Sequence, residues 1–234
     1  MTERALSGGR IIVLGGTGSL GQSVTERFLA DGASVLVADA RPPTGASRQE
    51  DADYVIVDAL DEASVSAALA KSPPPSAVVN LIGGYTPPQA LSGLEVSVLR
   101  QQLDINLVTA AIVTKYAMAV LAAHGGGPLV HVSSRVAAEK GENGFAYSVS
   151  KLGVVRLVEA AAGEGREQGV RVNCIMPSII DTPANRAAMP DAKHDRWPKP
   201  SELAAVLAFL ISDDAALISG AAIPVYGRAS SRDR

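Results

Sequence analysis

A phenol and an ammonium group stand four residues apart in the chain, at Tyr147 and Lys151. If this segment is helical, the spacing places both side chains on one face. A cation near a phenol favours the phenolate and lowers its pKa, so proton exchange with a substrate hydroxyl becomes easier near neutral pH. The pair is a candidate for acid–base chemistry, although the same spacing is common on solvated helix faces and does not decide the matter alone.

A glycine-rich turn is the second candidate site. It lies between a short apolar run at residues 10–14 and a helical pattern that begins near Ser19. Glycines at such a strand-to-helix turn let the backbone approach a pyrophosphate, whose charge then faces the helix N-terminus. The residues of this turn that we predict to bind a dinucleotide are Gly15, Thr17, Gly18, Ser19, Leu20 and Gly21.

An acid after the next predicted strand bears on the choice of dinucleotide. Asp39 lies 18 residues beyond Gly21. A carboxylate in that place accepts hydrogen bonds from the ribose hydroxyls and repels a 2′-phosphate. Arg41, two residues further on, could instead bind such a phosphate. We therefore predict NAD(H) as the cofactor, with NADP(H) as the alternative.

The elements that must position these groups alternate along the chain. Short apolar, β-branched runs predict strands at 10–14, 34–38, 54–57, 77–81, 129–132, 170–175 and 222–226. Helical patterns occupy 19–31, 61–71, 94–123, 145–168 and 201–212, whereas 177–200 is rich in proline and shows no periodicity. Seven strands joined by helical crossovers predict an α/β fold: a Rossmann-type, doubly wound parallel sheet with helices on both faces.

Composition narrows the class of protein. A single cysteine, Cys174, excludes a disulfide framework, and three scattered histidines predict no metal site. With a net charge of −3 and no basic block, we expect no nucleic-acid partner. No uninterrupted apolar run is long enough for a membrane span, and the first ten residues are too polar for a signal peptide. We expect a cytoplasmic protein of one domain over 1–234, with a core at about 10–227 and a polar tail at 228–234.

Together these motifs resemble the short-chain dehydrogenase/reductase family over about residues 10–227. The resemblance implies an NAD(P)-dependent oxidoreductase that transfers a hydride between nicotinamide and a ketone or secondary alcohol. Tyr147 would be the general acid in reduction and the base in oxidation, and Lys151 would hold the nicotinamide ribose and lower the phenol pKa. Ser134, which precedes Tyr147 by 13 residues, would hydrogen-bond the substrate carbonyl. Asn106 would position a water that relays protons through Lys151.

The resemblance also implies further cofactor contacts. Ser19 stands where the family usually has a glycine, Leu81 and Ile82 depart from its Asn-Asn-Ala-Gly stretch, and Ser178 replaces the glycine of its Pro-Gly pair. The additional residues expected at the cofactor, from the adenine end to the carboxamide end, are Asp58, Ala59, Asn80, Gly83, Pro177, Ile180 and Thr182.

Two other functions stay open. Residues 181–186, Met189, Trp197 and Pro200 resemble the lid segment of dihydropteridine reductases, a subgroup of the same family, which raises reduction of a quinonoid substrate as an alternative. Those enzymes usually lack the catalytic serine and the helix asparagine that this chain has. The other alternative is a dinucleotide-sensing module without catalysis. The complete catalytic set argues against it, because a sensor needs no proton donor.

Substrate recognition is expected in loops that follow the strands. Tyr85, Arg135 and Trp197 are the candidate substrate contacts, and specificity should depend on 83–97, 135–145 and 178–200. We expect a small carbonyl or alcohol substrate. The long helical regions near 94–123 and 145–168 are rich in Ala and Val, which predicts a homodimer or homotetramer packed through them. His131 and Cys174, in contrast, are predicted to be structural residues inside strands.

Overall fold

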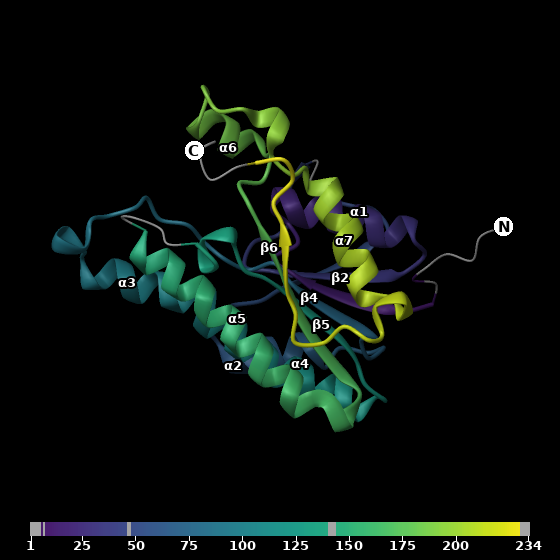
Figure 1. The fold of residues 1–234 in the computed structure, drawn as a ribbon. Coiled ribbons are helices and arrows are strands. Elements are labelled where there is room, and N and C mark those ends of the chain that lie inside the picture. Colours follow the sequence, from purple (N-terminus) through teal and green to yellow (C-terminus); the bar gives the residue numbers. More distant parts are fainter. Residues whose placement is uncertain (1–5, 7, 46–47, 140–143, 230–234) are drawn as a thin grey trace.

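A single parallel sheet of seven strands organises the chain. The computed structural model describes residues 6, 8–45, 48–139 and 144–229, so the last five residues of the predicted tail and part of the predicted specificity segment 135–145 lie outside the described residues. The strand order is β3-β2-β1-β4-β5-β6-β7, with every neighbouring pair parallel (Figure 1). This confirms the doubly wound α/β fold predicted from the sequence.

The observed elements follow the predicted ones closely. The strands are β1 (Arg10–Leu14), β2 (Ser34–Asp39), β3 (Ala52–Ile56), β4 (Ala77–Asn80), β5 (Gly127–Val132), β6 (Val170–Pro177) and β7 (Ala222–Val225). The helices are α1 (Ser19–Ala30), α2 (Glu62–Leu69), α3 (Val96–Leu103), α4 (Thr109–Ala123), α5 (Phe145–Gly165), α6 (Pro183–Ala188) and α7 (Pro200–Ile211). The third strand begins two residues earlier than predicted.

Helix α6 is the element that the sequence pattern did not reveal. It has only six residues, which is too short to show helical periodicity. Its start is nevertheless encoded locally, because Pro183 occupies the first turn and the Thr182 hydroxyl accepts a hydrogen bond from the Asn185 N–H.

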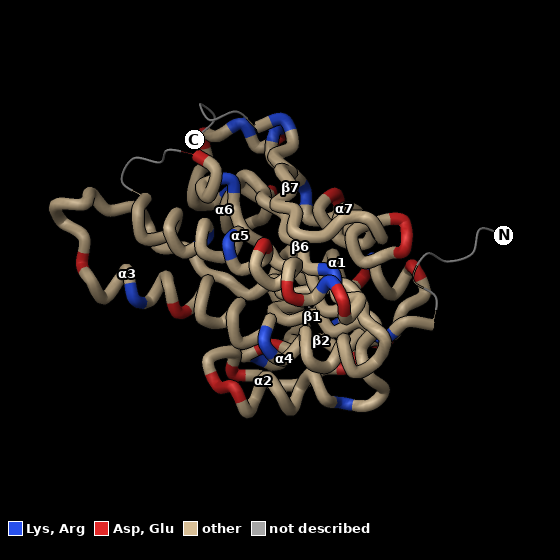
Figure 2. The backbone as a smooth tube through the Cα atoms, turned by 60° about the horizontal axis from the view of Figure 1, so that its bottom comes forward, with Lys and Arg blue, Asp and Glu red and all other residues tan. Residues whose placement is uncertain are grey.

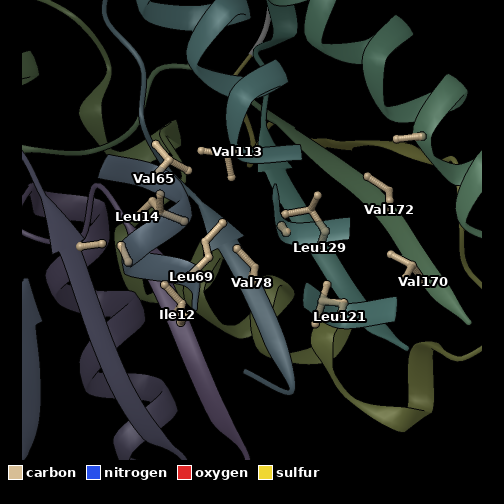
Figure 3. Close-up of a cluster of buried hydrophobic side chains, with 14 of the residues drawn as sticks. Ile12, Leu14, Val65, Leu69, Val78, Val113, Leu121, Leu129, Val170 and Val172 are labelled. Atoms are coloured by element: carbon tan, nitrogen blue, oxygen red, sulfur yellow. The ribbon is translucent and has the colours of Figure 1, made fainter. Parts of the chain in front are cut away.

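Both faces of the central strands are buried, which explains why β1 and β4 are almost entirely apolar. Successive residues of β1 point to opposite faces: Ile11 and Val13 pack under α1 and α7, whereas Ile12 and Leu14 pack under α2, α4 and α5. Figure 3 shows the second of these layers, in which Val65, Leu69, Val113 and Leu121 from the helices meet Val78 and Leu129 from the strands. Acidic and basic residues are interspersed over the outer elements (Figure 2).

One helical run is long and apolar enough, by length and composition alone, to cross a membrane. It extends from Val96 to Ala123 and has a mean hydropathy of 1.7 over its most apolar window. In the fold this run covers the sheet, and its residues Val113, Ala117 and Leu121 are fully buried in the core. Core packing therefore accounts for its apolar character.

The topology brings the predicted motifs to one edge of the sheet. The strand order reverses between β1, which continues toward β2, and β4, which continues toward β5. In open parallel sheets such a reversal leaves a crevice at the carboxyl ends of the strands, where ligands bind. The glycine turn after β1, the loop after β4 and Ser134 after β5 all lie at that edge.

We expect two glycine-to-alanine changes in helices to have opposite effects. A Cβ at Gly21, in α1, would lie 2.4 Å from the Gly16 Cα, whereas a Cβ at Gly163, in α5, would meet no described atom within 4 Å beyond its chain neighbours and its own helix backbone. Gly21→Ala should lower the free energy of unfolding by about 1–3 kcal/mol through overpacking. Gly163→Ala should raise it by about 0.5–1 kcal/mol, because alanine loses less backbone entropy in a helix. Urea unfolding curves measure both changes, and effects of the same sign would contradict the packing described here.

Candidate active site

The glycine turn leaves the N-terminus of α1 open. Gly18 is the N-cap residue, and no side chain of the described residues caps the helix there. A Cβ at Gly18 would have a single neighbour, the Gly15 carbonyl oxygen at 3.9 Å, whereas Gly15 adopts a φ of +78° and a Cβ there would lie 3.0 Å from the Ile82 nitrogen. Exposed N–H groups at a helix start, approached without side-chain obstruction, suit the pyrophosphate of a dinucleotide. The residues present therefore fit the predicted cofactor.

Asp39 is tied to this turn through Thr17. Its Oδ2 accepts hydrogen bonds from the Thr17 backbone N–H at 3.0 Å and from the Thr17 hydroxyl at 2.8 Å. Oδ1 accepts a longer bond, of 3.4 Å, from the Arg41 backbone N–H. The carboxylate is thereby held at the end of β2, where it retains acceptor capacity for ribose hydroxyls. The exposed Arg41 side chain stays close enough along the chain to keep NADP(H) as the alternative.

Tyr147 lies in the first turn of α5, next to the Tyr85 ring and the Ser134 hydroxyl. Its ring meets the Tyr85 ring edge to face, with 5.2 Å between the ring centroids and 88° between the planes. Burial raises the pKa of the Tyr147 phenol above its usual value of 10, the Ser134 hydroxyl counteracts this by hydrogen bonding, and the nearby Tyr85 adds to the rise. The structure thus places the Ser134 hydroxyl beside the Tyr147 phenol.

Lys151 follows one turn later, and its surroundings correct one expectation. Its side chain is buried, and Nζ donates to the Val132 carbonyl at 3.1 Å while lying 5.9 Å from the Tyr147 ring centroid. Burial lowers the pKa of Lys151 to about 8. We expected Lys151 to lower the phenol pKa, but it is not among the causes of the Tyr147 shift. Burial therefore sets the direction of the phenol pKa shift. The ammonium is directed to the Val132 carbonyl.

Asn106 sits in a π-helical turn, Asp104–Val108, inside the long helical run. Its amide binds Gly84 at both ends: Nδ2 donates to the Gly84 carbonyl at 3.0 Å, and Oδ1 accepts from the Gly84 N–H at 3.0 Å. A Cβ at Gly83 would lie 2.8 Å from Asn106 Oδ1 and 2.8 Å from Lys151 Nζ. Asn106, Lys151 and the loop after β4 therefore meet at one point, where a side chain on Gly83 would displace the Asn106 and Lys151 side chains.

A second layer of polar residues supports this point, and sequence reasoning did not find it. Gln102 and Ser150 are buried. Gln102 Nε2 donates to the Thr86 hydroxyl at 2.8 Å, and Asn106 Nδ2 donates to the Ser150 hydroxyl at 3.1 Å. One signal was available, because Gln102 precedes Asn106 by one helical turn and shares its face.

The other predicted cofactor residues are distributed around the same edge. Asp58 is exposed beyond β3, where its Oδ1 accepts from the Leu60 N–H at 2.9 Å, and Ala59 follows it. At the other end Pro177 closes β6, the Ile180 carbonyl accepts from Asn185, and Thr182 caps α6.

The three predicted substrate contacts differ in their surroundings. Tyr85 is 65% exposed beside Tyr147. Arg135 stacks on the Tyr226 ring, donates to the Ala229 carbonyl and pairs with Glu139, so its guanidinium is already used to hold the C-terminal segment. Trp197 is only 3% exposed and packs against the His194 ring, 4.7 Å away. Trp197 lines a cavity with Asp181 and Arg186 of its own segment, and of the three only Tyr85 contacts Tyr147 among the contacts described.

Ser133 and Cys174 have structural surroundings, as predicted for Cys174. The Ser133 hydroxyl donates to the Lys151 carbonyl at 2.7 Å and is buried, which leaves Ser134 as the hydroxyl next to Tyr147. Cys174 is fully buried in β6, and burial raises the pKa of its thiol to about 12. A thiol in that state is neither a nucleophile nor a metal ligand at neutral pH.

Comparisons with known proteins agree with this site. Residues 15–227 match a family model described as enoyl-(acyl carrier protein) reductase. The chain is 31% identical to cis-4-hydroxycyclohexanecarboxylate dehydrogenase of Sinomonas cyclohexanicum, over 93% of this chain and 95% of that protein. It is 26% identical to 7alpha-hydroxysteroid dehydrogenase of Bacteroides fragilis, over 93% and 92%. A short-chain type dehydrogenase/reductase from Mycobacterium ulcerans superposes with a TM-score of 0.88 at 27% identity, covering 96% of this chain and 90% of that one.

The chain belongs to the short-chain dehydrogenase/reductase family. It is accordingly an oxidoreductase enzyme, of a family whose members use NAD(P)(H) and act on small molecules. The similarity to the dihydropteridine reductase lid, which the sequence suggested for residues 181–200, is not shown by these comparisons.

We expect replacement of Lys151 by methionine to stabilise the protein while abolishing turnover. The folded-state pKa of Lys151, about 8, lies below the ordinary 10.5, so folding disfavours the cation fully below pH 8, and this penalty disappears as the pH rises to 10.5. At about 1.4 kcal/mol per pKa unit, and allowing for the lost bond to Val132, Lys151→Met should raise the free energy of unfolding at pH 7 by about 1–3 kcal/mol.

Urea unfolding at pH 7 measures this gain, and Lys115→Met is the matched control. Lys115 is exposed and pairs with Glu62 in solvent, so its loss should leave the free energy of unfolding almost unchanged. A Lys151→Met variant that is less stable than the parent protein would contradict the cost assigned to the buried ammonium.

Proposed function

We propose that this enzyme transfers a hydride between NAD(H) and a ketone or secondary alcohol, with Tyr147 as general acid in reduction and general base in oxidation. The observation that carries the proposal is the meeting of Tyr147, Ser134, Lys151 and Asn106 at the carboxyl edge of the sheet, beside an open helix N-terminus. The dinucleotide, when bound, supplies or accepts the hydride. The protein supplies orientation and the proton.

The raised pKa of Tyr147 suits the reductive direction. A phenol that burial keeps protonated at neutral pH is ready to donate its proton to a developing alkoxide. In oxidation the same group must first lose its proton. Ser134, which hydrogen-bonds the phenol, is placed to donate to the substrate oxygen as well, so that substrate oxygen and phenol are held together.

Lys151 is proposed to hold the nicotinamide ribose. Of the three N–H donors of its ammonium, one is directed to the Val132 carbonyl. The remaining two have no ion-pair partner among the described carboxylates, and the ribose offers hydroxyl oxygens as acceptors. The lowered pKa of Lys151 is consistent with an ammonium that lacks such partners before the dinucleotide binds.

Tyr85 supports a ring-bearing substrate. Its exposed ring stands beside Tyr147 and forms a flat apolar wall next to the proton donor. The names of the two relatives above denote dehydrogenation of alcohols on a cyclohexane and on a steroid. We propose a cyclic secondary alcohol or ketone as the substrate class, with residues 83–97 as its main wall.

The two alternatives are less well supported. A quinonoid substrate was suggested by residues 181–200, but Trp197 of that segment packs inside its own loop rather than beside Tyr147. A dinucleotide sensor would not need the buried polar residues that hold the Asn106 amide in place.

We also propose that the chain acts as a single cytoplasmic domain that pairs into a homodimer or homotetramer. Val108 and Leu152, on the long helical run and on α5, are each about two-fifths exposed, at 39% and 41%. Apolar side chains on these neighbouring helices would be covered by a second copy packed against them.

Tyr147→Phe tests the proposed mechanism. Turnover should fall by about 10²–10⁴-fold, because one proton-transfer group is lost, while NADH still binds. The measurement is a turnover screen with NADH and NADPH over cyclic ketones, quinones and quinonoid pterins, together with NADH binding by fluorescence. Tyr116→Phe is the control, since that phenol binds Glu62 on the surface. Near-parental turnover in Tyr147→Phe would overturn the role, and binding without turnover in the parent protein would favour the sensor.

Asp39→Asn tests the preference for NAD(H). The amide oxygen can still accept from Thr17, so the turn keeps its anchor, but the charge that repels a 2′-phosphate is gone. We expect the parent protein to have a higher kcat/KM with NADH than with NADPH, and the substitution to shrink that ratio by about tenfold, or 1.4 kcal/mol. A parent preference for NADPH would show instead that Arg41 decides the choice.

A further inference from the structure

A buried histidine behind the cofactor site makes hydrogen bonds at both ring nitrogens. His131, in β5, is 1% exposed. Its Nδ1 lies 3.1 Å from Nδ2 of Asn80 in β4, and its Nε2 lies 2.9 Å from the Thr114 hydroxyl in α4. Asn80 and His131 are also direct partners in the β4–β5 ladder. The histidine therefore links a strand end to the helix that covers the sheet.

The donor and the acceptor of each hydrogen bond in this series are determined by the neighbouring groups. Asn80 Oδ1 accepts from the Ile82 N–H at 3.1 Å, so Asn80 Nδ2 faces the histidine as a donor. An amide nitrogen cannot accept, and His131 Nδ1 must therefore be the unprotonated acceptor. Nε2 then carries the ring proton and donates to the Thr114 oxygen, whose own proton goes to the Ala110 carbonyl at 2.8 Å. The neutral ring agrees with a pKa that burial lowers to about 3.

This series of hydrogen bonds ends at the Ile82 backbone, in the loop between the glycine turn and Lys151. Ile82 lies in the loop after β4, and its backbone nitrogen is the atom that a Cβ on Gly15 would approach to 3.0 Å. The next residue, Gly83, passes between Asn106 Oδ1 and Lys151 Nζ. A displacement of Ile82 would thus shift its contact with the glycine turn on one side and the contact of Gly83 with Lys151 on the other.

We propose that His131 is a positioning residue for the cofactor: through Asn80 it holds the backbone at Ile82 and Gly83 in register with the glycine turn and Lys151. The inference rests on the proposed function in that the dinucleotide binds at this edge. His131 touches neither cofactor nor substrate in this scheme. It holds the Asn80 amide in one orientation, because a rotated amide would lose its hydrogen bonds to both Ile82 and His131.

Two substitutions of His131 separate positioning from general packing. In His131→Asn the side-chain oxygen replaces Nδ1, so the acceptor for Asn80 is kept and the bond to Thr114 is lost. In His131→Gln the longer amide reaches Thr114 in place of Nε2, and the acceptor for Asn80 is lost. Thr114→Val removes the far end of the chain while leaving the Asn80–His131 bond intact.

The readouts are the Kd for NADH, from fluorescence titration, and the exchange rate of the Ile82 amide hydrogen in the protein without cofactor. We expect His131→Gln to raise the Kd about tenfold, the change that loss of one buried hydrogen bond brings, and to speed Ile82 exchange by a similar factor. His131→Asn and Thr114→Val should lower Tm but change the Kd and Ile82 exchange by less than about threefold. If His131→Gln does not fold, His131→Leu, which removes the same acceptor, replaces it.

Equal Kd and equal Ile82 exchange in His131→Asn and His131→Gln would overturn the proposal, and so would a loss of NADH affinity in Thr114→Val as large as that in His131→Gln. The two levels of inference can fail separately. Absence of NADH and NADPH binding in the parent protein would refute the proposed function. Ile82 exchange, which needs no cofactor, would still decide whether His131 holds the loop.

Discussion

The buried ammonium of Lys151 is the constraint around which the site is built. A cation is costly to remove from water unless polar partners replace the solvent. Here the described partner is the Val132 carbonyl at the end of β5, and the nearby Cys174 thiol stays neutral because its own pKa is raised. The group is carried by α5 and lies next to Gly83, where a Cβ would come within 2.8 Å of Nζ. A site that keeps such a charge poorly solvated is prepared for a ligand rich in hydroxyl oxygens.

The loop after β4 is the part of the fold that makes this arrangement precise. Two asparagines hold it from opposite ends: Asn80 binds the Ile82 N–H, and Asn106 binds both backbone groups of Gly84. Gly83 lies between them, against Lys151. Each asparagine is in turn hydrogen-bonded to a buried polar neighbour. These bonds fix the loop to the sheet and to the long helical run. Loops at the carboxyl edge of a parallel sheet become functional when their scaffold is rigid in this way.

The periphery of the site is organised more loosely and divides its tasks. Asp39 and Thr17 are hydrogen-bonded to each other at the proposed ribose end, whereas the exposed Tyr85 ring lies beside Tyr147 at the proposed substrate end. Arg135 joins the segment after Ser134 to the C-terminal residues through Tyr226, which closes the edge of the sheet rather than contacting Tyr147. This division is typical of a fold in which cofactor contacts come from the core and specificity comes from loops.

The sequence by itself determined the architecture and supplied the reacting groups that we propose. Seven buried strands, the glycine turn, Asp39 and the Tyr147–Lys151 pair could be predicted, because periodicity reports which faces are buried and short-range spacing reports which side chains share a helix face. The tertiary structure alone decided the direction of the Tyr147 pKa, the burial of Trp197 and the use of Arg135. It also decided the hydrogen-bond chain through His131. Those properties depend on desolvation and on partners far away in the sequence, and neither leaves a local pattern.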